Sequence, residues 1–171
     1  MAKEDMNDEL NLTRDQMVQL LNEDLAREYQ AIIAYTVYSQ VLKGAEYMDI
    51  ARELEKHAAE ELAHALKISK QIDYLGGIPG VIPKPVKSLD DPQEILQADL
   101  ENERETVANY RQRIRQAEAM GEFALSETLR DIIVQEQDHE IDLCDALGIE
   151  VPLPRKATDR KFANFKPARN H

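Results

Sequence analysis

Apolar residues recur every three or four positions through most of the chain, the spacing that places them on one face of an α-helix. Signals for helix starts and stops divide this pattern. Thr13 and Gln16 form a capping box, and Asp91 before Pro92 marks a second start. Glycines close the patterned stretches. The sequence therefore predicts an all-α fold with four long helices, over residues 14–43, 46–75, 92–120 and 122–147.

The segment between the second and third helices is long and cannot be helical. Residues 76–90 contain three prolines and three glycines, which break a helical hydrogen-bond ladder. Fifteen extended residues reach about 50 Å, and the second helix is about 45 Å long. The segment can therefore run the length of the bundle and start the third helix parallel to the second. This predicts a four-helix bundle with a long crossover rather than an up-and-down bundle with short turns.

Composition supports one helical domain and a reducing environment. The chain of 171 residues has no tryptophan, six glycines and a single cysteine, Cys144. Its N-terminus is charged and lacks the apolar core of a signal peptide. No apolar run is nearly as long as a membrane helix, which needs about 20 residues. We expect a cytoplasmic protein. We divide it into an N-terminal extension (1–12), the bundle (13–147) and a basic C-terminal tail (148–171).

The net charge of −12 is unevenly distributed. Residues 151–171 carry +5, so residues 1–150 carry −17. An acidic body repels nucleic acid and attracts cations, although an acidic excess is also typical of a solvated surface. The tail could contact DNA or other anionic partners, or pack on a neighbouring subunit through Phe162 and Phe165. The net charge argues against DNA coating as the main role.

A Glu-x-x-His motif occurs twice, and each copy has a partner glutamate. Residues three apart share one face of a helix, so each motif directs a carboxylate and an imidazole at one point. The upstream glutamate lies 33 residues earlier in both cases, and every member recurs after 75 residues. The resulting set is Glu28, Glu61 and His64, followed by Glu103, Glu136 and His139.

The antiparallel order of the helices brings these six residues to the middle of the bundle, inside it. So many buried charges are costly unless cations neutralise them. Carboxylate and imidazole donors without thiolates favour iron or manganese over structural zinc or calcium. The alternative is solvated glutamates with two incidental histidines. Tyr35 and Tyr110, each seven residues after its glutamate, either donate a hydrogen bond to a ligand carboxylate across the bundle or are ordinary core aromatics.

At these residues the chain resembles the ferritin-like superfamily over about residues 13–147, specifically bacterioferritins and Dps-like mini-ferritins with a di-iron centre inside the bundle. The resemblance implies that Glu61 and Glu136 bridge two irons. It places Glu28 and His64 on one iron, and Glu103 and His139 on the other. It also implies a ferroxidase that oxidises Fe(II) with O2 or H2O2 and stores ferric mineral in a homo-oligomeric cage, for iron storage, detoxification and protection from oxidative stress.

Several positions depart from particular branches of the superfamily. Leu62 replaces the haem-binding methionine of bacterioferritins, which argues against haem. No fifth helix is evident, which favours a twelve-subunit cage over one of twenty-four subunits. Glu105 and Ser126 occupy the places of the cysteine pair of thiol-bearing Dps-like proteins. Thr106 replaces the extra ligand glutamate of rubrerythrins.

Three interpretations remain open at this point. The alternative function is a rubrerythrin- or catalase-like peroxide-scavenging di-metal enzyme without iron storage. We expect His57 to be a surface or interface histidine, the alternative being an iron transit site with Glu53 and Glu60. We expect Cys144 to be packed inside the bundle, the alternative being a reactive thiol.

Overall fold

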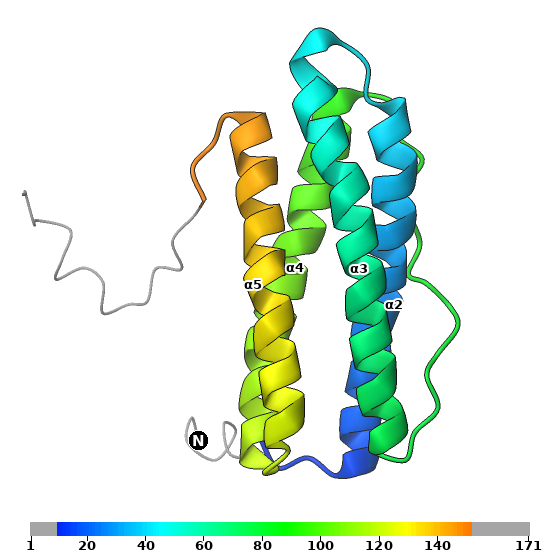
Figure 1. Ribbon diagram of the computed structural model, residues 1–171, viewed down its shortest axis with the longest axis vertical. Helices are drawn as coiled ribbons and strands as arrows, with labels where there is room; N and C mark the ends of the chain where they lie inside the picture. Colours follow the sequence, from blue (N-terminus) through cyan, green and yellow to red (C-terminus); the bar gives the residue numbers. More distant parts are fainter. Residues whose placement is uncertain (1–9, 152–171) are drawn as a thin grey trace, which may run out of the picture.

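The computed structural model describes residues 10–151, and this part of the chain is an all-α four-helix bundle (Figure 1). A 3-10 turn, η1, precedes the second long helix, and no strand occurs among the described residues. The elements are α2 (Arg14–Val41), η1 (Ala45–Tyr47), α3 (Met48–Tyr74), α4 (Pro92–Ala119) and α5 (Phe123–Leu147). The basic tail, with Phe162 and Phe165, and most of the N-terminal extension lie outside the described residues.

The helices begin where the capping signals predict. The backbone N–H of Gln16 donates to Thr13 Oγ1 at 3.2 Å, and the backbone N–H of Thr13 donates to Gln16 Oε1 at 2.8 Å. Asp91 caps α4 by accepting from the backbone N–H of Glu94 at 3.0 Å. The predicted end of the first helix is two residues too long. The helix ends at Val41 because the chain then turns toward η1, and Gly44 (φ 117°) lies within that turn.

The crossover is confirmed, and it lies against α2. Asn22 holds its first part: the Asn22 side chain accepts from Gly80 N–H at 2.7 Å and donates to the Ile78 carbonyl at 3.1 Å. Further along α2, Lys84 N–H donates to the Ala26 carbonyl at 3.0 Å. Near the end of the helix, Tyr38 Oη donates to the Lys87 carbonyl at 2.5 Å. The crossover thus returns to the end of the bundle where α3 began, and α4 runs parallel to α3 (Figure 1).

Two separate hydrophobic clusters fill the bundle, one toward each end. The first contains Met17, Leu21, Leu25, Ala65, Ile68, Ile72, Leu75, Tyr110, Ile114, Ala117, Leu125, Leu129 and Ile132. The second contains Ala34, Tyr35, Tyr38, Leu42, Ile50, Leu54, Ile95, Leu96, Leu100, Leu143 and Cys144. Between them lies a layer of buried polar side chains. The predicted packing of Cys144 inside the bundle is confirmed, because its exposed fraction is 0%.

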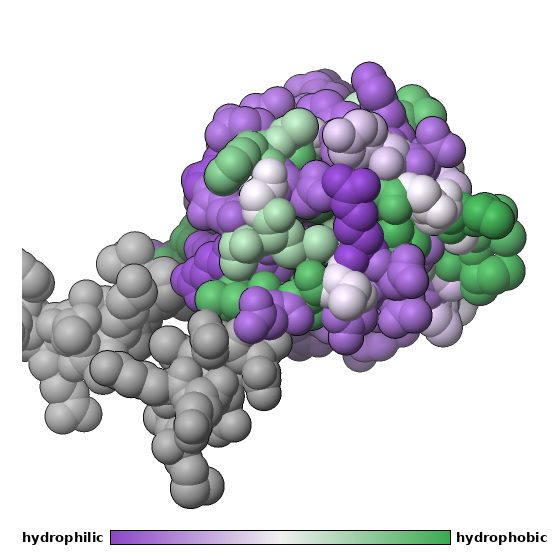
Figure 2. Space-filling view, turned by 90° about the horizontal axis from the view of Figure 1, so that it is seen from below, coloured by the Kyte–Doolittle hydropathy of each residue, from purple (hydrophilic) through white to green (hydrophobic). Residues whose placement is uncertain are grey.

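The outside of the bundle is mostly polar, with local hydrophobic patches. Viewed from the end where α3 stops, hydrophilic surface surrounds several apolar areas, one at the edge where the crossover runs (Figures 1 and 2). Ile78, Val81 and Ile82 of the crossover are largely exposed. Within residues 10–151, none of the helices combines the length and apolar character that a membrane span requires.

Candidate metal centre

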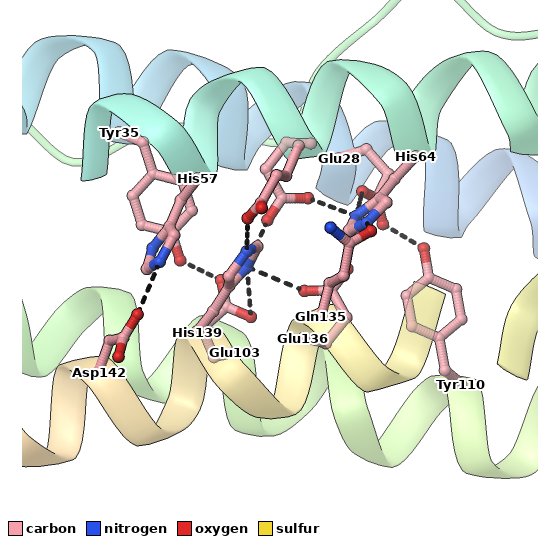
Figure 3. Close-up of polar contacts among 12 residues, drawn as sticks. Glu28, Tyr35, His57, His64, Glu103, Tyr110, Gln135, Glu136, His139 and Asp142 are labelled. Carbon is pink, nitrogen blue, oxygen red and sulfur yellow. Dashed lines mark hydrogen bonds and ion pairs between the residues drawn. The ribbon is translucent and has the colours of Figure 1, made fainter. Parts of the chain in front are cut away.

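The buried polar layer contains all six residues of the repeated motif. Each is at most 2% exposed. Glu28 comes from α2 and Glu103 from α4, whereas α3 and α5 each contribute one Glu-x-x-His pair on their inner face (Figure 3). The set is Glu28, Glu61, His64, Glu103, Glu136 and His139. The structure therefore brings together every residue that the sequence pattern selected.

One half of the centre surrounds the inner nitrogen of His64. His64 Nδ1 lies 3.3 Å from Glu28 Oε2, 3.3 Å from Glu61 Oε2 and 3.1 Å from Glu136 Oε1. The candidate ligand atoms of these four residues all lie within 4.8 Å of one another. A single divalent cation can therefore contact one donor from each.

The other half surrounds the inner nitrogen of His139. His139 Nδ1 lies 3.0 Å from Glu61 Oε1, 3.6 Å from Glu136 Oε2 and 4.0 Å from Glu103 Oε2. The candidate ligand atoms of these four residues also lie within 4.8 Å of one another. Glu61 and Glu136 belong to both groups, which is the arrangement expected of two carboxylates that would bridge a pair of ions.

Several inward-facing atoms of the centre are buried without a hydrogen-bond partner. They are Glu28 Oε2, Glu61 Oε1, Glu103 Oε2, Glu136 Oε1 and His139 Nδ1. Buried polar atoms are rarely left unsatisfied, because the desolvation cost is then uncompensated. Cations bound among them would satisfy these atoms, so the donor set fits two divalent ions.

In the absence of metal, bound protons offset part of the negative charge of the cluster. Burial, reinforced by repulsion from Glu61 and Glu136, raises the pKa of Glu28 and of Glu103 well above the usual carboxyl range. Burial lowers the pKa of His139, but the nearby carboxylates of Glu136 and Glu61 outweigh this effect and raise that pKa to about 12. Metal ligands must be deprotonated, so cations that bind here replace these protons.

The two tyrosines support the glutamates from across the bundle. Tyr35 on α2 donates a hydrogen bond from its hydroxyl to Glu103 on α4, and Tyr110 on α4 donates one to Glu28 on α2 (Figure 3). Both tyrosines are 1% exposed. Of the two alternatives for these tyrosines, the structure shows the hydrogen bonds to the cluster carboxylates.

Sequence reasoning missed the partners of the outer imidazole nitrogens. His64 Nε2 lies 3.0 Å from Gln135 Oε1, and His139 Nε2 lies 2.7 Å from Glu60 Oε2. Residues 60 and 135 are also 75 positions apart, each directly before a glutamate of the cluster. The repeat could therefore have identified them, had it been extended beyond the six principal residues.

The prediction that His57 is a surface or interface histidine is wrong, because the residue is buried inside the bundle. His57 is 3% exposed, and its ring is stacked on that of His139 with centroids 3.9 Å apart. Its Nε2 lies 3.1 Å from Asp142 Oδ2 on α5. The reason is the close packing of α3 against α5 at this level, which one helix's periodicity does not specify.

Four long helices, a crossover along the first of them and a buried Glu/His cluster at mid-height define the ferritin-like class of helical bundle. The chain belongs to this family: residues 18–149 match the ferritin-like domain.

Individual relatives agree with this assignment. The chain is 23% identical to the bacterioferritin of Brucella melitensis over 153 residues, covering 89% of this chain and 92% of that protein. A ferritin-like, diiron-carboxylate protein of Bacillus anthracis has a similar crystal structure. It is 34% identical with a TM-score of 0.75, over 78% of this chain and 96% of that one. A dodecameric thioferritin of Bacteroides fragilis, a bacterioferritin-related protein, is 27% identical with a TM-score of 0.74, over 80% and 87% of the two chains.

Proposed function

We propose that this protein is a ferroxidase that binds two Fe(II) ions as substrate and oxidises them with O2 or H2O2. The observation that carries the proposal is the pair of four-residue donor groups that share Glu61 and Glu136. Carboxylate and imidazole ligands suit iron, and the remaining coordination positions can accept an oxidant. The diiron-carboxylate protein and the bacterioferritin among the relatives support the same chemistry.

Each side chain has a defined task in this proposal. Glu61 and Glu136 bridge the two ions. Glu28 and His64 complete one site, and Glu103 and His139 complete the other. Tyr110 and Tyr35 fix the orientation of the terminal glutamates through their hydroxyl hydrogen bonds. The imidazoles release protons as the ions bind, and the ions supply the electrons that reduce the oxidant.

We further propose that copies of the chain assemble into a hollow cage, twelve subunits being favoured over twenty-four, that stores the ferric product. The related thioferritin is described as dodecameric, which supports the smaller cage. Exposed apolar side chains on the crossover, Ile78, Val81 and Ile82, are suited to burial against a neighbouring subunit. The argument against haem stays a prediction, and it rests on Leu62, which is 53% exposed on α3.

The direct test is aerobic addition of Fe(II) to purified, metal-free protein, followed by absorbance of the ferric product and by native mass. We expect catalysed oxidation by the parent, and loss of most of the rate in Glu61→Ala and Glu136→Ala. Glu127→Ala is the matched control, because this α5 glutamate has a side chain 78% exposed and lies away from the cluster. Parent-like oxidation by both cluster variants would overturn the proposal.

The same assay distinguishes the alternative function. A peroxide-scavenging enzyme would consume H2O2 over many turnovers with a reductant and would retain no ferric mineral. The ferroxidase consumes oxidant in proportion to Fe(II) and retains the ferric product in a particle of high mass. Comparing the oxidant consumed per Fe(II) with O2 and with H2O2 identifies the working oxidant.

A further inference from the structure

The two halves of the centre are related by the repeat of 75 residues, but their surroundings differ in charge. Positions 60 and 135 are equivalent. Gln135 contacts the outer nitrogen of His64 on the opposite helix (Figure 3), and Glu60 contacts that of His139. One position holds a glutamate and the other a glutamine. We propose that Glu60 makes the His139 half the tighter of the two metal sites, which fills first, whereas Gln135 leaves the His64 half weaker. This inference rests on the proposed dinuclear centre.

The physical basis is the hydrogen bond behind each imidazole. When Nδ1 binds a cation, Nε2 carries the proton and donates it outward. For His139 the acceptor is the Glu60 carboxylate, at 2.7 Å. For His64 the acceptor is the neutral Gln135 amide oxygen, at 3.0 Å. A carboxylate behind a histidine raises the basicity of the ligating nitrogen and holds the ring in place, and removing such a partner lowers metal affinity about 10–100-fold. A neutral acceptor raises that basicity less.

A second pair of equivalent residues also has different partners in the two halves. Asp24 lies one helical turn before Glu28, and Asp99 lies one turn before Glu103. Arg113 neutralises Asp24, with its Nε 2.7 Å from Asp24 Oδ2. Asp99 is 2% exposed, and its Oδ2 has no hydrogen-bond partner. A guanidinium is therefore present beyond the Glu28 end of the centre, and the Asp99 carboxyl beyond the Glu103 end has no such counter-charge.

The position of Glu60 and Gln135 makes the inference testable without unfolding the protein. Both residues are partly exposed, and both line a polar pocket of about 120 Å³ between α3 and α5. Gln and Glu are close in size, so exchanging them at either position changes the charge and leaves the packing in place. Each exchange changes the charge by one unit, and only the imidazole of one histidine separates the exchanged residue from the proposed ion.

The test is titration of chelator-treated protein with Co(II), followed by calorimetry and by the visible absorption of bound Co(II). Two variants isolate the halves: Glu28→Ala leaves the His139 half, and Glu103→Ala leaves the His64 half. We expect Glu28→Ala to bind its single Co(II) about tenfold more tightly than Glu103→Ala does.

Exchanging Glu60 or Gln135 should then change the Co(II) affinity of one half at a time. Adding Glu60→Gln to Glu28→Ala weakens binding about tenfold or more, and adding Gln135→Glu to Glu103→Ala strengthens it. In the otherwise unmodified chain, Glu60→Gln with Gln135→Glu reverses which half fills first. Glu127→Gln removes a charge from α5 outside the pocket and leaves both affinities unchanged. A purely structural role for Glu60 would not produce the gain in affinity with Gln135→Glu.

The outcomes separate this inference from the proposed function. The inference would be overturned if the two isolated halves bound Co(II) with equal affinity, or if neither exchange changed the affinity. The proposed function would still hold in that case, provided that the parent binds two Co(II) per chain and oxidises Fe(II). Binding of fewer than two Co(II) per chain by the parent would overturn both. Two bound ions of the predicted order, without Fe(II) oxidation, would support the inference and contradict the ferroxidase.

Discussion

At the scale of single residues, two equivalent aspartates are stabilised in different ways. Asp24 and Asp99 occupy the same place in the repeat and are equally buried. Arg113 pairs with Asp24, and the position equivalent to Arg113 is Tyr38, whose hydroxyl donates to the Lys87 carbonyl instead. Burial raises the pKa of Asp99 well above the usual range. Asp99 therefore reduces the stability of the fold at neutral pH, whereas Asp24 is part of an ion pair.

Replacing Asp99 with asparagine should stabilise the metal-free protein. The folded pKa of Asp99 lies above its unfolded value of about 4, so its destabilising effect is absent at lower pH and grows as the pH rises toward the folded pKa. We expect Asp99→Asn to raise the free energy of unfolding by about 1 kcal/mol at pH 7.5, and by less at pH 5. Urea unfolding in the presence of a chelator at both pH values measures the difference.

The same substitution at Asp24 should have the opposite sign. Burial raises the pKa of Asp24 more than Arg113 lowers it, so the pair itself adds little stability. Asp24→Asn nevertheless leaves the guanidinium of Arg113, which is 5% exposed, without its counter-charge. Such a loss costs about 3–5 kcal/mol. Destabilisation by Asp99→Asn at both pH values would contradict the assignment of Asp99 as a destabilising group.

At the scale of helices and connections, the sequence predicted what is encoded locally. Thr13, Asp91 and Gly148 mark helix ends through capping and backbone preferences, so their positions were right to within a residue or two. The six cluster residues were found because helical periodicity and the repeat of 75 residues coincide there. The same repeat also relates Glu60 to Gln135, but their contacts with the two histidines, like the burial of His57, depend on how α3 packs against α5. No pattern within one helix specifies that packing.

Gly77, at the start of the crossover, lies close against α2. A Cβ at Gly77 would lie 2.3 Å from Val18 Cγ1, which is far inside van der Waals contact. We expect Gly77→Ala to destabilise the protein by about 1–3 kcal/mol. Val18→Ala in the same chain removes the clashing methyl groups and should restore part of the loss, as measured by a double-mutant cycle of urea unfolding.

Gly76 is the control for this prediction. It has φ 88° and nothing within 4 Å of an added Cβ, so Gly76→Ala acts through backbone strain alone. Val18→Ala should not restore stability in that variant. Equal restoration at both glycines would show that the contact with Val18 is not the cause.

At the scale of the whole molecule, the bundle is two hydrophobic clusters separated by a charged layer. The clusters contain apolar side chains from all four helices, whereas the layer buries four carboxyl and two imidazole groups of the candidate centre. Burying so many ionisable groups is unfavourable unless they are paired, and protons alone balance them only in part. An apolar layer at this level would be more stable without metal, whereas the charged layer can bind divalent cations. The stability of the fold should therefore depend on metal.

Metal loading should therefore raise the thermal stability of the whole bundle. A ligand at a hundredfold excess over its Kd stabilises the folded state by about 2.7 kcal/mol, and two ions contribute twice this if they bind independently. For a chain of this size, Tm should rise by on the order of 10 °C when Co(II) is added to chelator-treated protein. The variant with both Glu61→Ala and Glu136→Ala lacks the two shared carboxylates and should show almost no rise, because neither ion keeps a full ligand set.

Mg²⁺ should have a small effect on the parent, since it prefers oxygen ligands and retains its water. An equal rise in Tm for the parent and the double variant would mean that Co(II) stabilises the protein elsewhere, and the buried layer would then need another explanation.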